Sequence, residues 1–188
     1  MTSYAALLRG INLGNHHKVP MAALRAVLSD VGLSDVATYI QSGNAVFASE
    51  GSEVEELTTG IKARLAAEFG FEIPVTLRSA AQLGALRDAN PFLGRGEEPA
   101  VQSVGFLSAE PDAARVSELL TDPLHDPTRT GGDEFELMGR EVFLFHPRGY
   151  GQTNLTNSFF DRRLGTTMTV RNWRTVMQLF TMLAEVSS

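Results

Sequence analysis

The chain has 188 residues, of which 43% are hydrophobic and 20% charged, and its net charge at neutral pH is −6. This composition is typical of a globular protein and excludes wholesale disorder, and the negative charge disfavours non-specific binding to phosphate backbones. The absence of cysteine excludes disulfides, thiolate nucleophiles and thiolate metal sites. Neither a basic leader nor a run of ~20 apolar residues is present, so we expect a cytoplasmic protein without a membrane partner.

The first half of the chain predicts six elements in the order strand, helix, strand, strand, helix, strand. Apolar residues recur at helical spacing after Pro20, and Ser52 followed by Glu55 is typical of a capping box. Pro74 indicates that the last strand lies at a sheet edge. The predicted elements are residues 4–8, 20–31, 36–40, 45–48, 52–69 and 71–77.

The second half repeats the first five elements of this order, β-α-β-β-α, in outline, after a short helix at 79–88 and a linker-like stretch at 94–99. A strand at 101–107 and a helix at 111–120 precede a polar loop at 122–133. The remaining predicted elements are a hairpin of 134–138 and 141–145, a helical piece at 159–164 and an amphipathic helix at 171–186. We detect no residue-level repeat between the halves.

This order predicts an α+β fold in which two ferredoxin-like halves, each β-α-β-β-α-β, pack together. We place one subdomain at residues 1–90 and a second, which includes the C-terminal helix, at residues 100–188.

The loop after the first strand is the first candidate binding site. It contains Arg9, Gly10, Asn12 and Gly14, with Lys18 just before a helix. Glycines permit close backbone approach, and a helix N-terminus with nearby cations favours an anion. The loop lacks the Gly-Lys-Ser/Thr ending of a Walker loop. The alternative is a structural loop whose glycines serve only the turn.

The predicted turn at 41–44 is the second candidate. Gln41 and Asn44 would present amides that donate or accept hydrogen bonds to a ligand. The alternative is ordinary hairpin chemistry, in which Ser42-Gly43 makes the turn and the amides cap nearby backbone groups.

A local basic stretch near the C-terminus is the third candidate. Arginines lie beside Tyr150 and Trp173, and Arg171-Asn172 directly precedes that tryptophan. Such residues recognise phosphates or stack on bases. The alternative is that Trp173 packs between the halves while the arginines form surface ion pairs.

The histidines do not predict a metal site. His16 and His17 are adjacent, so their rings diverge on a regular backbone, and His125 and His146 are predicted to be exposed in loops. No serine has an obvious partner base in the sequence. We therefore expect no metal and no cofactor, and we assign no catalytic residue.

Three stretches resemble one family when they are taken together. They are Leu8-Arg9-Gly10-Ile11-Asn12 with Lys18-Val19-Pro20-Met21, then Tyr39-Ile40-Gln41-Ser42-Gly43-Asn44, and then Leu155-Thr156-Asn157 with Arg171-Asn172-Trp173. The combination resembles the bacterial domain-of-unknown-function family numbered 1697. The resemblance implies a cytoplasmic α+β protein with paired ferredoxin-like subdomains and implies no activity.

The chain departs from that family's pattern at two places. The paired histidines His16-His17 stand in a loop that is usually glycine-rich, and Gln152-Thr153-Asn154-Leu155 replaces a stretch that usually resembles Arg-Thr-Lys-Leu. Two positive charges of the family pattern are thus missing from the second place.

The candidate residues are mainly amides and cations, which bind charge more readily than they move protons. We therefore expect a binding module for a small anionic ligand that bears phosphate or carboxylate. The alternatives are an enzyme that acts on a phosphorylated or acylated metabolite and, less favoured, a nucleic-acid or protein interaction module. The predicted ligand-binding residues are Arg9, Asn12, Lys18, Gln41, Asn44, Arg171 and Asn172.

Overall fold

The computed structural model describes residues 1–51, 53–93 and 101–186. The chain divides into two compact units, Met1–Leu86 with Met177–Ser188, and Arg87–Val176. The C-terminal residues from Met177 thus group with the first unit, whereas the sequence placed the closing helix with the second half. Ser52 of the expected capping box and the predicted linker at 94–99 lie outside the described residues.

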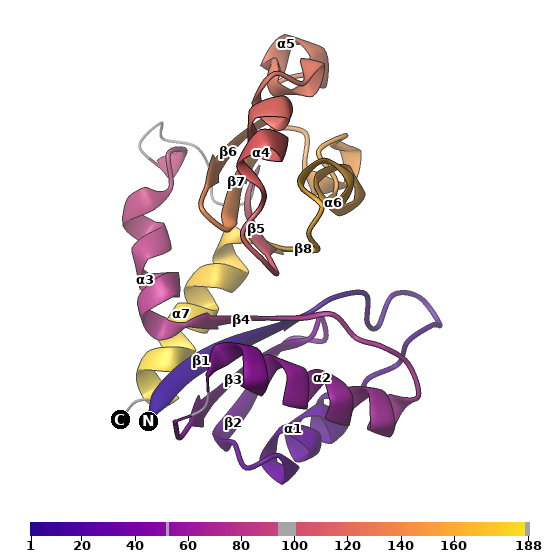
Figure 1. The fold of residues 1–188 in the computed structure, drawn as a ribbon, viewed down its shortest axis with the longest axis vertical. Coiled ribbons are helices and arrows are strands. Elements are labelled where there is room, and N and C mark those ends of the chain that lie inside the picture. The colour runs from indigo at the N-terminus through magenta and orange to yellow at the C-terminus, as the bar shows by residue number, and fades with distance from the viewer. Residues whose placement is uncertain (52, 94–100, 187–188) are drawn as a thin grey trace. The chain divides into compact units, whose positions relative to one another are not determined.

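The α+β class is confirmed. The described residues form two four-stranded antiparallel sheets and seven α-helices, which Figure 1 shows in chain order. None of the helices in this part of the chain has the length and apolarity that a membrane crossing needs.

The first unit contains one sheet with the strand order β2-β3-β1-β4. Helices α1 and α2 cover one face of it (Figure 1), and their apolar stripes meet the alternating apolar residues of the strands in one buried core. The elements are β1 (Thr2–Leu8), α1 (Met21–Asp30), β2 (Ser34–Tyr39), β3 (Asn44–Ser49), α2 (Val54–Phe69) and β4 (Val75–Ser79).

Turn and cap residues behave in this unit as the sequence predicts. Gly70 ends α2 in the left-handed conformation, at φ 76°. Pro74 precedes β4, which lies at the sheet edge beside β1. Because proline donates no backbone hydrogen bond, an edge is where it is tolerated.

The second unit contains a sheet with the equivalent order β6-β7-β5-β8. Its core lies between the strands and helices α4 and α6, around Phe135, Phe159 and Phe160. The elements are β5 (Gln102–Leu107), α4 (Ala113–Leu120), α5 (Pro127–Thr130), β6 (Glu134–Met138), β7 (Glu141–Phe145), α6 (Asn157–Leu164) and β8 (Met168–Asn172). Helices α3 (Ala80–Ala89) and α7 (Trp173–Val186) contain the two boundaries between the units.

Two predictions for the second half were wrong. The polar loop at 122–133 contains the 3-10 helix Pro123–His125 and α5, each capped by an aspartate, Asp122 and Asp126. Arg171 and Asn172 end strand β8 instead of beginning a helix. The strand continues directly into α7 without a turn. The helical periodicity of the residues after 172 therefore led the prediction to include 171 and 172 in the helix.

The fourth strands of the two units share a short residue-level repeat, contrary to expectation. Thr76-Leu77-Arg78-Ser79 ends β4, and Thr169-Val170-Arg171-Asn172 ends β8. In both, the arginine donates from Nη1 to the carbonyl of the residue before it, at 2.9 Å. In both, the last residue accepts a hydrogen bond from the backbone N–H three residues later.

Candidate functional site

The two candidate loops of the first unit meet at the end of β1. Leu7 pairs with Asn44 in the sheet, and the backbone N–H of Leu8 donates to the carbonyl of Gly43 at 2.8 Å. This register places Arg9 and the loop that follows it beside the turn at 40–43. Asn12 bonds to Gln41 of the turn, which is 29 positions later in the sequence.

Asn12 fastens the loop to the turn with its side-chain amide. Its Nδ2 donates to the carbonyls of Val19 and Gln41, at 2.9 and 2.8 Å, and its Oδ1 accepts from the N–H of Val19 at 2.9 Å. The residue also adopts a left-handed conformation, with φ 55°, which asparagine tolerates better than most residues. Both Nδ2 protons of Asn12 therefore form hydrogen bonds to backbone carbonyls, and these bonds fix the loop.

Gly43 allows the turn to approach β1 closely. It has φ +77°, and a Cβ there would lie 2.7 Å from Leu8 Cβ and 2.8 Å from Ile11 Cδ1. No other residue type fits both the conformation and the space.

Asn44 is fully buried in β3, at 0% exposure. Its Nδ2 donates to the carbonyl of Tyr39 at 3.2 Å and to Ser42 Oγ at 2.9 Å, so the amide supports the turn from inside. This geometry favours the hairpin interpretation for Asn44, while Gln41 is exposed at the tip of the same turn.

The helix that follows the loop begins without a capping side chain. Pro20 is the N-cap residue of α1, and the first turn carries no acidic residue. The first helical hydrogen bond runs from Leu24 N–H to the carbonyl of Pro20 at 3.0 Å, which leaves the amides of Met21, Ala22 and Ala23 ahead of it. Such a helix end carries a partial positive charge.

Two cations belong to the same loop. Lys18 is exposed, and its Nζ donates to the carbonyl of Gly14 at 2.6 Å. Arg9 is half-buried, and its backbone N–H donates to the carbonyl of Pro74 at 2.9 Å. His17 stacks on Phe71 with ring centroids 4.4 Å apart, which holds the loop against the first unit.

Arg171 and Asn172 belong to the second unit. Asn172 Oδ1 accepts from Thr175 N–H at 2.7 Å and thereby caps α7. Burial lowers the pKa of Arg171 to about 10, because desolvation disfavours the charged guanidinium. Since Arg78 and Ser79 occupy the equivalent positions in the first unit, the repeat supports a role in the fold for both residues.

No group of three or more metal-ligating side chains occurs among the described residues. His146 is not exposed as predicted but buried, and it forms a hydrogen bond between its Nε2 and Ser103 Oγ at 2.8 Å. The two residues are 43 positions apart. The sequence alone could have paired them only through the register of the second sheet, in which Ser103 lies opposite Leu144.

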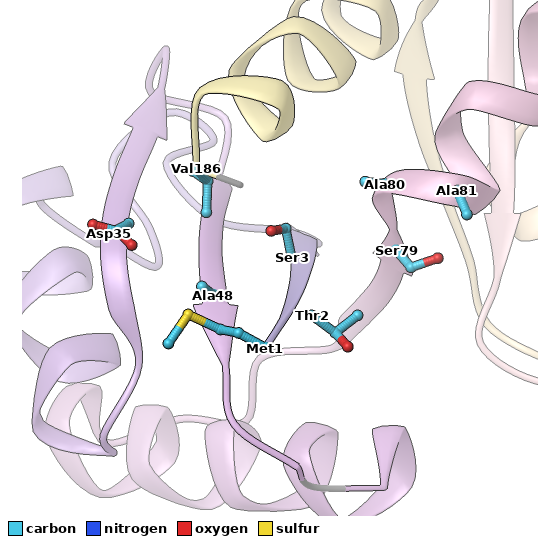
Figure 2. A pocket seen from close by; sticks show the side chains of 9 residues that line it. All are labelled: Met1, Thr2, Ser3, Asp35, Ala48, Ser79, Ala80, Ala81 and Val186. Carbon is cyan, nitrogen blue, oxygen red and sulfur yellow. The ribbon is translucent and has the colours of Figure 1, made fainter. Parts of the chain in front are cut away.

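The first unit also contains a cavity of about 570 Å³, at the opposite end of β1. Figure 2 shows it between the start of β1 at Met1, the junction of β4 and α3 at Ser79, and Asp35 of β2. None of the residues that line it belongs to the predicted site. Among the described residues that line the cavity, Asp35 is the only one with a charged side chain.

The comparisons with known proteins agree with the resemblance seen in the sequence. A conserved bacterial protein from Streptococcus pneumoniae, SP0830, is similar in structure, with a TM-score of 0.75 and 28% sequence identity over 97% of this chain and 98% of that one. None of the curated proteins matches. The family described as protein of unknown function (DUF1697) matches residues 1–143. The chain therefore belongs to the DUF1697 family.

Proposed function

We propose that the protein binds a small anion, bearing phosphate or carboxylate, at the loop formed by residues 9–20 and the turn at 40–43, together called the anion loop. The observation that carries this proposal is the N-terminus of α1, which has neither a capping side chain nor an acid in its first turn. An anion is the ligand that such a helix end favours.

The surrounding charges support the same ligand. Lys18 precedes the helix by a few residues, and Arg9 begins the loop. The hydrogen bond from Lys18 to Gly14 is a neutral-acceptor bond at the surface, so an anion competes for that ammonium group with a stronger charge-assisted bond. Gln41 at the tip of the turn adds an uncharged donor and acceptor.

The amides of Asn12 and Asn44 have a different task in this proposal. Asn12 ties the loop to the turn, and Asn44 supports the turn from inside, before any ligand arrives. A site whose frame is already fixed loses less conformational entropy on binding.

We further propose that each unit is a ferredoxin-like module. The support is the order of the elements together with the placement of the fourth strand beside the first in both sheets. Such folds host many functions, so the anion loop and not the fold carries the functional argument.

Thermal unfolding with a panel of anions tests the proposal: inorganic phosphate, nucleotides, sugar phosphates and coenzyme A esters. A ligand at about a hundred times its Kd adds roughly 2.7 kcal/mol of stability, which raises Tm by several degrees. We expect one class of anion to do so, and we expect Lys18→Gln to remove most of the shift.

The chain supplies its own matched controls. Lys62, the other lysine of the chain, is exposed in α2, and Lys62→Gln should respond like the wild type. Ala22→Glu puts a carboxylate into the first turn of α1 and should block the anion, whereas Ala26→Glu on the same helix should not. The proposal is wrong if no anion shifts the wild type, or if Lys18→Gln and Ala22→Glu respond as the wild type does.

A further inference from the structure

Three buried polar side chains from three strands meet at one end of the second sheet. Ser103 lies in β5, Asp133 immediately precedes β6, and His146 immediately follows β7. The register brings them together, because Gln102 and Glu134 both pair with Phe145. Their exposed fractions are only 3%, 1% and 3%, in the order Ser103, Asp133 and His146.

The hydrogen bonds of this cluster are incomplete. Ser103 Oγ and His146 Nε2 are 2.8 Å apart. In the described part of the chain, His146 Nδ1 and both carboxylate oxygens of Asp133 have no hydrogen-bond partner. Arg148 Nη2 lies 3.9 Å from Asp133 Oδ2, within ion-pair range but beyond hydrogen-bond range.

The tautomer of His146 decides which polar groups of this cluster can be satisfied. If the proton were on Nε2, Nδ1 would be a buried acceptor near a buried carboxylate that also needs a donor, and both groups would stay unsatisfied. With the proton on Nδ1, the imidazole carries a donor that a bridging water can connect to the Asp133 carboxylate, because no direct hydrogen bond joins the two groups. In that tautomer Nε2 accepts the hydrogen bond from the Ser103 hydroxyl.

The electrostatics agree with this assignment. Burial lowers the pKa of His146 and outweighs two influences that raise it, a hydrogen bond with its own backbone and the nearby Asp133 carboxylate. The imidazole is thus neutral at neutral pH, which is the state that can accept a proton from a hydroxyl. Asp133 would stabilise the imidazolium that forms when the proton arrives.

We propose that Ser103, His146 and Asp133 form a serine–histidine–aspartate relay, which makes Ser103 a nucleophile toward small activated acyl compounds. Ser103 Oγ would attack the acyl carbon while its proton passes to His146 Nε2. The bond to the leaving alkoxide then breaks as His146 returns the proton, and water hydrolyses the acyl-serine by the same route. Asp133 is a positioning residue in this scheme.

Arg148 and Tyr150 lie against two members of the cluster, and Ser103 itself is only 3% exposed, so the substrate in this proposal is a small molecule. The guanidinium of Arg148 lies against Gly131, where a Cβ would come within 2.6 Å of Arg148 Cζ, and Arg148 Nη2 donates to the carbonyl of Thr130 at 2.7 Å. The ring of Tyr150 packs edge-on to His146, with centroids 5.5 Å apart. Arg148 is exposed, so Asp133 borders a side chain that reaches solvent.

Labelling of the wild-type protein with a small fluorophosphonate tests the proposal. Ser103 Oγ would attack phosphorus, fluoride would leave, and the serine proton would pass to His146. Intact and peptide mass spectrometry should show one adduct, located on Ser103. A folded wild-type protein that acquires no adduct on Ser103 overturns the proposal without any variant.

Variants and a spectroscopic measurement separate catalysis from packing. Ser103→Ala should abolish the adduct, and His146→Gln should slow its formation about 100-fold or more. Nitrogen-15 NMR of histidine should show the proton on Nδ1, and Asp133→Asn should slow labelling at least ~10-fold and change that tautomer. A proton found on Nε2, or equal labelling rates in His146→Gln and the wild type, would contradict the relay. Circular dichroism checks that each variant is folded.

Discussion

The two units have the same strand order, but the hydrogen bonding of the polar side chains in their loops differs. In the first unit, the amide of Asn12 satisfies three backbone groups and ties a surface loop to a turn. In the second unit, Asp133 and His146 are buried, with polar atoms that have no hydrogen-bond partner among the described residues. The same topology therefore supports a completed polar frame in one unit and an incomplete one in the other.

This difference in hydrogen bonding indicates which residues are candidates for binding a ligand and which for catalysis. A fully bonded frame is rigid, and in the proposed function its surface, the start of α1 with two cations, is what the anion contacts. An incomplete buried cluster carries an energetic cost that the fold tolerates, and such clusters are often functional. Both functional proposals therefore rest on the loops and not on the shared architecture.

The largest expected effect comes from a glycine in each unit. Gly43 and Gly131 have similar φ angles, +77° and +73°, so alanine is strained equally at both. At Gly43 the new Cβ meets Leu8 and Ile11 of the core, but at Gly131 it meets the far end of the long Arg148 side chain, which can shift more easily than packed core atoms. We expect Gly43→Ala to cost about 2–4 kcal/mol of unfolding free energy and Gly131→Ala about 1 kcal/mol.

Urea unfolding of both variants measures that difference. Gly10→Ala is a control for the conformation alone, because Gly10 has φ +75° and nothing within 4 Å of its Cβ position. It should resemble Gly131→Ala. Equal losses at Gly43 and Gly10 would show that the close approach of the turn to β1 contributes nothing.

The second comparison of the two units concerns how their histidines affect the pH dependence of stability. The pKa of His146 is lowered in the folded protein, chiefly by burial, so the unfolded chain binds a proton more readily than the folded one. Stability from the neutral imidazole is therefore fully present above the unfolded value of about 6.5 and is lost as pH falls toward the lowered folded pKa. We expect urea midpoints of the wild type to fall between pH 7 and pH 5.

Two histidine variants test which unit causes the loss of stability at low pH. His146→Gln removes the titrating group beside Asp133 and Arg148 and should flatten the pH dependence, whereas His16→Gln, in the exposed loop of the first unit, should retain it. A wild-type slope that persists unchanged in His146→Gln would place the acid sensitivity elsewhere.

The sequence predicted the α+β class, the family and most elements, because these depend on local pattern. Apolar spacing gave α1, Gly70 marked the end of α2, and Pro74 marked an edge strand. Strand β8 was missed since five residues run directly into a helix without a turn signal. Local pattern also could not show that Met177 onward groups with the first unit.

The roles of individual site residues depended on tertiary partners. Asn12 and Asn44 have the residue type of a ligand site, yet their amides hold backbone groups that lie close only after folding. Ser103 and His146 looked unremarkable in sequence because 43 residues separate them. The ligand-binding roles of Arg9, Lys18, Gln41, Arg171 and Asn172 stay predictions.

The smallest expected effect tests whether the repeat at β4 and β8 is structural. Ser79 accepts a hydrogen bond from Gln82 N–H at 3.2 Å, and Asn172 accepts one from Thr175 N–H at 2.7 Å. Ser79→Ala and Asn172→Ala should each cost about 1 kcal/mol, because each removes a helix cap. The exchanges Ser79→Asn and Asn172→Ser should cost only a few tenths, since both side chains cap well. Thermal unfolding of the four variants measures these differences. A loss in Asn172→Ser as large as that in Asn172→Ala would show that the asparagine side chain does more than cap α7.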